Sequence, residues 1–179
     1  MADTKPVDTD AISKGTARSW NDWLGWLSGI GAHELSHAEI ARRVVATGDA
    51  SSWWAQSIAV AWEQHIGRRK PGQRPCGTFE VSVTRTLAGE VSALLESIAA
   101  RFDATSGFDG VAREGAACTS VTPKRSYWRC RLADGSGVQV SLEPRGAGRV
   151  LVAVTHGRIA DQHAGPRWRA FWKEELGRL

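Results

Sequence analysis

The stretch Trp128-Arg-Cys-Arg-Leu-Ala-Asp-Gly-Ser-Gly-Val-Gln-Val-Ser-Leu142 decides the fold of the C-terminal half of this chain. Its apolar residues take every second position on both sides of the Asp134-Gly135 pair. Such alternation places apolar side chains on one face of a strand, and an Asp-Gly pair favours a tight turn. The stretch therefore predicts a β-hairpin with one buried face.

Further strand and helix patterns surround this hairpin. Phe79, Val81 and Val83 alternate with polar residues, and residues 149–155 form a more apolar segment that is typical of a strand in mid-sheet. Two apolar stripes with helical spacing follow the first strand and end the chain: Val91, Leu94, Leu95, Ile98 and Phe102, and Trp168, Phe171, Trp172, Leu176 and Leu179. The order predicts an α+β fold in which the last helix covers an antiparallel sheet. Residues 103–125 show no clear pattern, so we expect four or five strands and no strand pair before Tyr127.

The N-terminal half carries helical patterns only. Apolar spacing predicts a helix within residues 16–28, and Ser36-His-Ala-Glu39 fits a capping box that opens a second helix. A third stripe runs from Ser52 to Ile66, before a basic segment rich in proline and glycine. We therefore expect a disordered tail at 1–10, a three-helix domain at 11–67, a basic linker at 68–77 and an α+β domain at 78–179.

The composition limits the class of protein to which this chain can belong. The chain has 179 residues, 42% hydrophobic and 23% charged, which is ordinary for a globular protein. No apolar run approaches the roughly 20 residues that cross a bilayer, and the first residues lack the apolar core of a secretory signal. The three cysteines form no metal-like pair, so we expect a cytoplasmic protein without cofactors.

The second half resembles the SRPBCC, or START-like, helix-grip superfamily, and within it the homologues of the chaperone-ATPase activator. The resemblance covers about residues 76–179 and rests on Thr78–Leu87, the Glu90–Phe102 helix, Arg131–Ser136, Val150–His156 and Arg167–Leu176. It implies an antiparallel sheet gripping a C-terminal helix, here in a reduced form. The first half resembles a small helical bacterial domain of unknown function, through Arg18–Trp23, Leu35–Ile40 and Trp53–Gln56.

The helix-grip resemblance implies a non-catalytic binding protein that holds an apolar small ligand or a protein partner. Its pocket would lie between the inward face of the sheet and the last helix. The candidate pocket residues are Phe79, Val81, Trp128, Cys130, Val140, Val152, Trp168 and Trp172. Cys130 alternates inward and is expected to be an inert buried thiol, while His156 and His163 are expected to be hydrogen-bonded structural residues.

Two alternatives involve the N-terminal half. His33-Glu-Leu-Ser-His37 matches the H-E-x-x-H zinc motif, with Glu34 as base and Glu63 as a third ligand of a metallopeptidase. Against it, Gly29 and Gly31 precede the motif and the capping box begins a helix between the two histidines.

The second alternative is DNA binding. Residues 52–66 would be a recognition helix, followed by Arg68, Arg69, Lys70 and Arg74, which together equal the net charge of +4. However, this helix offers Trp53, Trp54 and Trp62, and only Gln56, Ser57 and Gln64 could contact base edges. A basic run of this kind is more often a solvated linker.

Tryptophan is unusually frequent, with nine in the chain. Six of them fall in the helical half: Trp20, Trp23, Trp26, Trp53, Trp54 and Trp62. Three short helices enclose too little volume for six indoles, so some are expected at a surface. We expect that surface to pack against the C-terminal domain or against a second copy of the chain in a homodimer.

Overall fold

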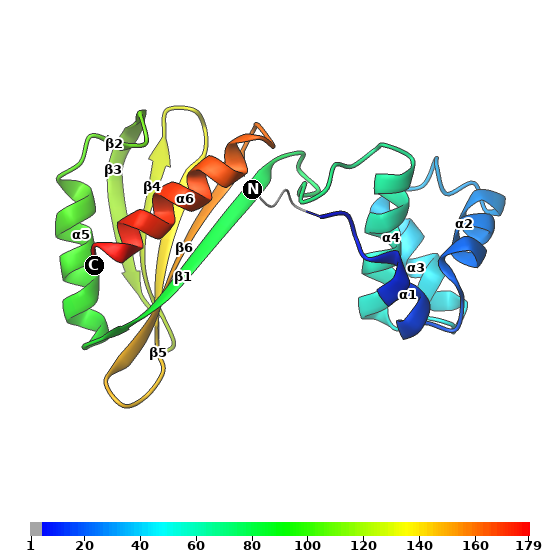
Figure 1. The fold of residues 1–179 in the computed structure, drawn as a ribbon, viewed down its shortest axis with the longest axis horizontal. Coiled ribbons are helices and arrows are strands. Elements are labelled where there is room, and N and C mark those ends of the chain that lie inside the picture. Colours follow the sequence, from blue (N-terminus) through cyan, green and yellow to red (C-terminus); the bar gives the residue numbers. More distant parts are fainter. Residues whose placement is uncertain (1–4) are drawn as a thin grey trace. The chain divides into compact units, whose positions relative to one another are not determined.

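The computed structural model describes residues 5–179 and divides into two compact units, one ending at Gly72 and the other running from Gln73 to Leu179. The first unit is helical (Figure 1) and contains α1 (Thr9–Gly15), α2 (Trp20–Gly29), α3 (His37–Ala46) and α4 (Ser52–His65). The second unit combines a sheet with two helices. The prediction of a mixed helix-and-sheet protein is confirmed.

Two helices of the first unit begin with a capping box. The hydroxyl of Ser36 accepts a hydrogen bond from the backbone N–H of Glu39, and the Glu39 carboxylate returns to the Ser36 backbone, which confirms the predicted capping box. Ser19 and Asp22 form a second capping box that opens α2. Each box satisfies backbone donors that have no partner inside the helix, so these serines set where the helices start.

The expected three-helix unit is not confirmed, because the unit has a fourth helix, α1, which begins in the expected tail and continues through residues for which no helix was predicted. The carboxylate of Asp8 accepts from the backbone N–H groups of Asp10 and Ala11, both at 3.0 Å, and so caps a helix of seven residues. Its one fully buried side chain, Ile12, packs in the core of the unit. A helix with a single buried apolar residue leaves no periodic stripe in the sequence, which is why the pattern did not reveal it.

The indoles of this unit differ widely in exposure. Trp23 is fully buried and Trp62 nearly so, whereas Trp53 is 67% exposed. The expectation that some indoles lie at a surface is confirmed by Trp53. What that surface contacts stays a prediction.

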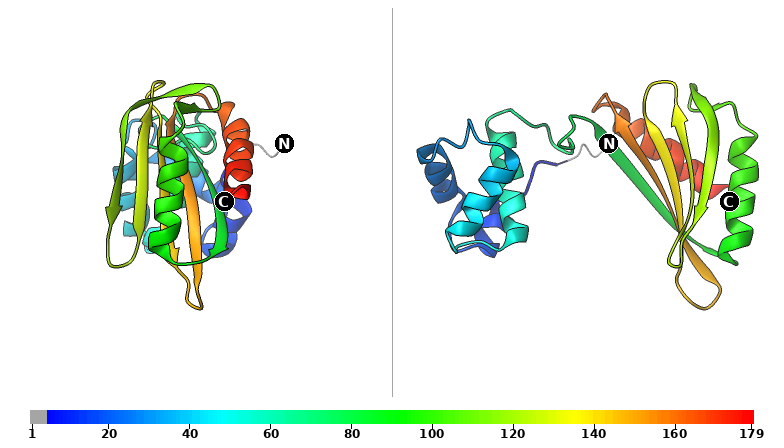
Figure 2. Two further views of the ribbon diagram at one scale, coloured as in Figure 1. Left: turned by 90° about the vertical axis from the view of Figure 1, so that its left-hand side faces the viewer. Right: turned by 180° about the vertical axis from the view of Figure 1, so that it is seen from behind.

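The second unit is built on one curled antiparallel sheet with strand order β1-β6-β5-β4-β3-β2. Its strands are β1 (Phe79–Ala88), β2 (Gly107–Phe108), β3 (Val111–Val121), β4 (Ser126–Leu132), β5 (Gly137–Pro144) and β6 (Arg149–Ile159). The helices α5 (Val91–Asp103) and α6 (Ala164–Gly177) lie on the same face of the sheet (Figures 1 and 2). The β4–β5 hairpin is confirmed, with Trp128 opposite Val140 and Cys130 opposite Val138.

The expectation of no strand pair between Phe102 and Tyr127 is wrong, because β2 and β3 pair there. β3 pairs with β4 from Arg113 to Val121, but its register shifts between Glu114 and Cys118. Gly115 takes the left-handed conformation there, at φ 70°. Three residues then face one on β4, and this bulge breaks the alternation by which a strand is recognised.

Candidate functional site

The eight candidate pocket residues lie together in one packed core between the sheet and the two helices. Aromatic rings fill this space: the Trp128 ring centroid is 5.2 Å from that of Phe102, and the Phe108 centroid is 5.0 Å from that of Trp172. Trp168 and Trp172 are 2% and 0% exposed. The covered face of the sheet is therefore a well-packed interior, in which these side chains contact one another.

A chain of hydrogen bonds crosses this core. Trp172 Nε1–H donates to His156 Nδ1 at 3.1 Å, His156 Nε2 lies 2.8 Å from Ser136 Oγ, and Ser136 Oγ donates to Asp134 Oδ1 at 2.6 Å. An indole can only donate, so Nδ1 is the acceptor and Nε2 carries the hydrogen that it donates to Ser136. Burial lowers the pKa of His156 to about 4, which keeps the ring neutral.

His156 is thus a hydrogen-bonded structural residue, as expected. In a Ser-His-Asp catalytic set the histidine lies between serine and carboxylate, whereas here the serine lies between the other two. Ser136 and His156 are also 1% and 0% exposed, so a substrate could not reach them without opening the core.

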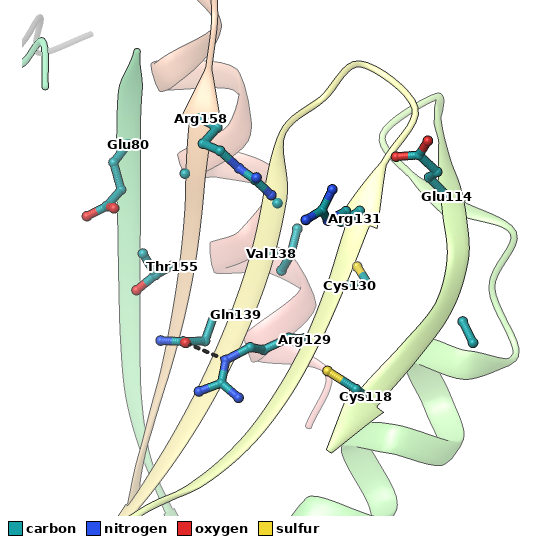
Figure 3. A pocket seen from close by; sticks show the side chains of 13 residues that line it. Glu80, Glu114, Cys118, Arg129, Cys130, Arg131, Val138, Gln139, Thr155 and Arg158 are labelled. Atoms are coloured by element: carbon teal, nitrogen blue, oxygen red, sulfur yellow. Dashed lines mark hydrogen bonds between the residues drawn. The ribbon is translucent and has the colours of Figure 1, made fainter. Parts of the chain in front are cut away.

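The opposite face of the sheet, which we term the open face, carries a depression of about 520 Å³ (Figure 3). Outward side chains from β1, β6, β5, β4 and β3 line it. Arg129 is tied down there, since its Nε–H donates to Gln139 Oε1 at 2.7 Å and its guanidinium stacks over Tyr127 at 4.2 Å. Arg131 and Arg158, both exposed, have no ion-pair partner within residues 5–179.

A bulge in β6 places Arg158 on this face. Val81 pairs with His156 and Phe79 with Ile159, so Gly157 and Arg158 together face Glu80. Arg158 adopts φ 58°, a left-handed conformation that costs a residue with a side chain about 1–2 kcal/mol. Without the bulge, alternation would turn Arg158 inward beside His156.

These arginines are not among the site residues predicted from the sequence. Arg129 and Arg131 alternate with the inward Trp128 and Cys130, and that pattern alone places them on the open face. An isolated glycine within a strand pattern, here Gly157, is the available signal for the bulge that redirects Arg158.

A second depression, of about 420 Å³, lies between the start of α5 and the β3–β4 turn. It is mostly apolar, lined by Val91, Leu95, Val121 and Pro123, and Val121 is 74% exposed. Arg125 at its rim is paired with Glu143 at 2.6 Å. Glu96, Lys124 and Arg125 also line it, so this depression combines a mostly apolar area with charges of both signs.

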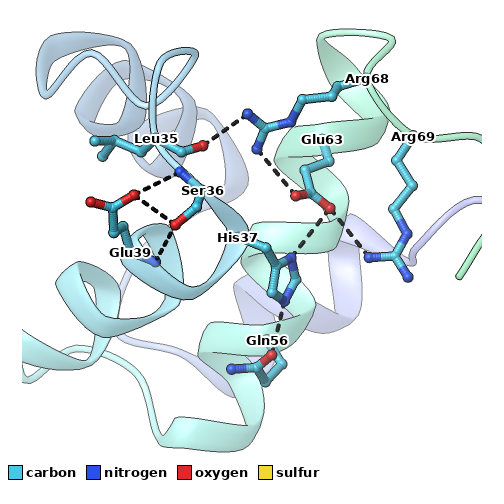
Figure 4. Close-up of polar contacts among 8 residues, drawn as sticks. All are labelled: Leu35, Ser36, His37, Glu39, Gln56, Glu63, Arg68 and Arg69. Carbon is cyan, nitrogen blue, oxygen red and sulfur yellow. Dashed lines mark hydrogen bonds and ion pairs between the residues drawn. The ribbon is translucent and has the colours of Figure 1, made fainter. Parts of the chain in front are cut away.

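The H-E-x-x-H residues do not share one helix. His33 lies in the turn before α3, with its side chain 62% exposed and 3.4 Å from Glu34, whereas His37 is the first residue of α3. His37 Nδ1 lies 3.2 Å from Glu63 Oε2 (Figure 4). Within residues 5–179, no three His, Cys, Asp or Glu side chains are grouped so that they could hold a metal ion.

Glu63 instead centres an ion-pair cluster. Its nearly buried carboxylate lies 3.1 Å from Arg68 and 3.2 Å from Arg69 (Figure 4), and Arg68 also donates to the Leu35 carbonyl at 2.8 Å. Arg74, in the other unit, is paired with Glu80 at 2.5 Å. Three of the four basic residues assigned to a DNA contact are therefore engaged with carboxylates, which weakens that alternative.

The cysteines occupy three different settings. Cys130 is buried as expected, and burial raises its thiol pKa to about 11. Cys76 and Cys118 are exposed. Hydrogen bonds with Thr78 and the nearby Arg74 charge lower the pKa of Cys76 below its ordinary value.

No protein-family model, curated protein or solved structure matches this chain. Residues 5–179 include no helix with the length and apolar character needed to span a membrane.

Proposed function

We propose that this chain is a non-catalytic cytoplasmic binding protein whose C-terminal unit, a shortened helix-grip module, binds a protein partner through the open face of its sheet. The strand order and the placement of α6 fit the helix-grip arrangement that the sequence resembles. The three free cysteines fit a reducing compartment.

One observation carries this proposal: the covered face of the sheet is filled by packed side chains, whereas the open face has an exposed depression. Beneath α6, Trp128, Trp168 and Trp172 are at most 2% exposed and pack against neighbouring rings, so an apolar ligand would have to displace them. The open face instead presents a depression of about 520 Å³ whose lining includes the charged residues Glu80, Glu114, Arg129, Arg131 and Arg158. A surface with unpaired arginines suits a protein surface better than a fatty or sterol-like ligand, because arginine is enriched in protein interfaces.

Photo-crosslinking in the cells that make the protein tests the proposal. Benzoylphenylalanine in place of Thr155, a residue that lines the depression, is expected to give a discrete adduct with one protein. The matched control carries the same group in place of Ala170, an exposed residue on α6, away from the open face, and is expected to give none.

Two results would overturn the proposal. One is an absence of adducts from position 155 above the background set by position 170. The other is a long-chain fatty acid that co-purifies in stoichiometric amount and quenches the buried tryptophans, since this would show that the packed core opens to hold an apolar ligand.

A further inference from the structure

The bulge of β6 aims a positive charge at a particular place on the open face. A Cβ added to Gly137 would lie 2.7 Å from Arg158 Nη2, so the guanidinium lies against the bare backbone of the neighbouring strand. Gly137 pairs directly with Gly157, and these two glycines leave room for the side chain to extend across β5. A left-handed arginine is uncommon, and such strain is found where the redirected side chain serves a function.

Arg131 points toward the same place from the other side. Figure 3 shows its guanidinium directed from β4 toward β5, where the Arg158 side chain ends. Two like charges that converge without a counter-ion repel each other, and an anion between them removes that cost. Arginine binds carboxylate and phosphate groups through paired N–H donors, so the geometry favours an oxyanion.

The charged residues around Arg131 and Arg158 favour a protein surface over a small anion as the ligand. Glu80 and Glu114 also line the depression, on β1 and β3, to either side of the arginines. Arg74 neutralises Glu80 in an ion pair, whereas Glu114 has no such partner within residues 5–179. A protein surface can place a carboxylate at the centre and a basic group opposite Glu114, but a lone phosphate dianion would meet repulsion there.

We propose that Arg131 and Arg158 clamp a carboxylate of an acidic segment on the protein partner, an inference that rests on the proposed binding through the open face. Glu114 then selects for a basic side chain beside that carboxylate. The left-handed conformation of Arg158 is retained because it supplies one half of the clamp.

Peptide binding to the full chain tests the clamp without the natural partner. A short fluorescein-labelled polyglutamate peptide is expected to bind at low ionic strength, and a polyglutamine peptide of the same length is not. The combined change Arg131→Gln and Arg158→Gly is expected to weaken polyglutamate binding about 10-fold, the effect of losing about 1.4 kcal/mol. Arg149→Gln with Arg169→Gln removes the same charge from two other exposed arginines and is expected to change affinity less than about 2-fold.

The choice of glycine at position 158 separates binding from folding. Glycine adopts the left-handed conformation without strain, so Arg158→Gly is expected to keep or raise Tm while it weakens binding. A lower Tm together with unchanged peptide affinity would make Arg158 a structural residue of the bulge and overturn the clamp.

Two further outcomes would also overturn this inference. Equal weakening by the Arg149 and Arg169 control would mean that only net charge matters. Inorganic phosphate that raises Tm through the same two arginines, with no polyglutamate binding, would identify a small-anion site instead. Neither outcome bears on the crosslink from position 155, so failure of the clamp and failure of the proposed function remain distinguishable.

Discussion

Acid should destabilise the C-terminal unit through His156. The ring is fully buried, accepts from Trp172 and donates to Ser136, so the native state holds it neutral. Its pKa is about 4, against 6.5 for an ordinary histidine. In the unfolded chain the ring takes up a proton below pH 6.5, and in the native state only near pH 4, so protons favour unfolding within this window.

The expected loss of unfolding free energy follows from the difference between the two pKa values of His156. Stability is complete above pH 6.5 and falls as the pH drops, by about 1.4 kcal/mol for each pH unit, which amounts to about 3 kcal/mol by pH 4. Asp134 contributes little in this window. Burial raises its pKa, but hydrogen bonds from Ser136 outweigh that effect and leave the pKa below 3.8.

Urea unfolding between pH 7.5 and 4.5 measures the effect. The free energy of unfolding of wild type is expected to fall about 2.5 kcal/mol further than that of His156→Asn, whose amide can accept from Trp172 but does not titrate. His163→Asn, at an exposed position, is the control and should follow wild type. Parallel pH profiles for wild type and His156→Asn would refute the reasoning.

Alanine in place of two helical glycines is expected to change the free energy of unfolding in opposite directions. Gly15→Ala should lower the free energy of unfolding by about 2 kcal/mol, because its Cβ would lie 1.9 Å from the Trp54 ring, whereas Gly25→Ala in open space should raise it by about 0.5–1 kcal/mol. Equal shifts of the two variants in thermal unfolding would contradict this packing. Iodoacetamide near neutral pH should modify the exposed Cys76 first and leave Cys130 unmodified until the chain unfolds, as read by mass spectrometry of the peptides. Early modification of Cys130 in the folded protein would show that the core is open.

The structural features that could be predicted from the sequence depend on interactions between residues close together in the chain. The β4–β5 hairpin follows from period-two alternation around Asp134-Gly135, and the start of α3 follows from the Ser36–Glu39 capping box. Both features depend on residues close together in the chain, so the amino-acid order alone determines them. The same holds for the inward direction of Cys130, which alternates with its neighbours on β4.

The features that could not be predicted depend on contacts between residues distant in sequence. The bulges at Gly115 and Arg158 depend on register with β4 and β1. An isolated glycine accompanies each bulge, but only the strand pairing shows which side chains the bulge redirects. Sequence alternation identified which residues face inward, but whether they enclose a cavity or a packed core depends on ring contacts such as that between Phe102 and Trp128. The convergence of Arg131 and Arg158 likewise exists only once β4, β5 and β6 lie side by side, because strand register places their side chains over one point of the sheet.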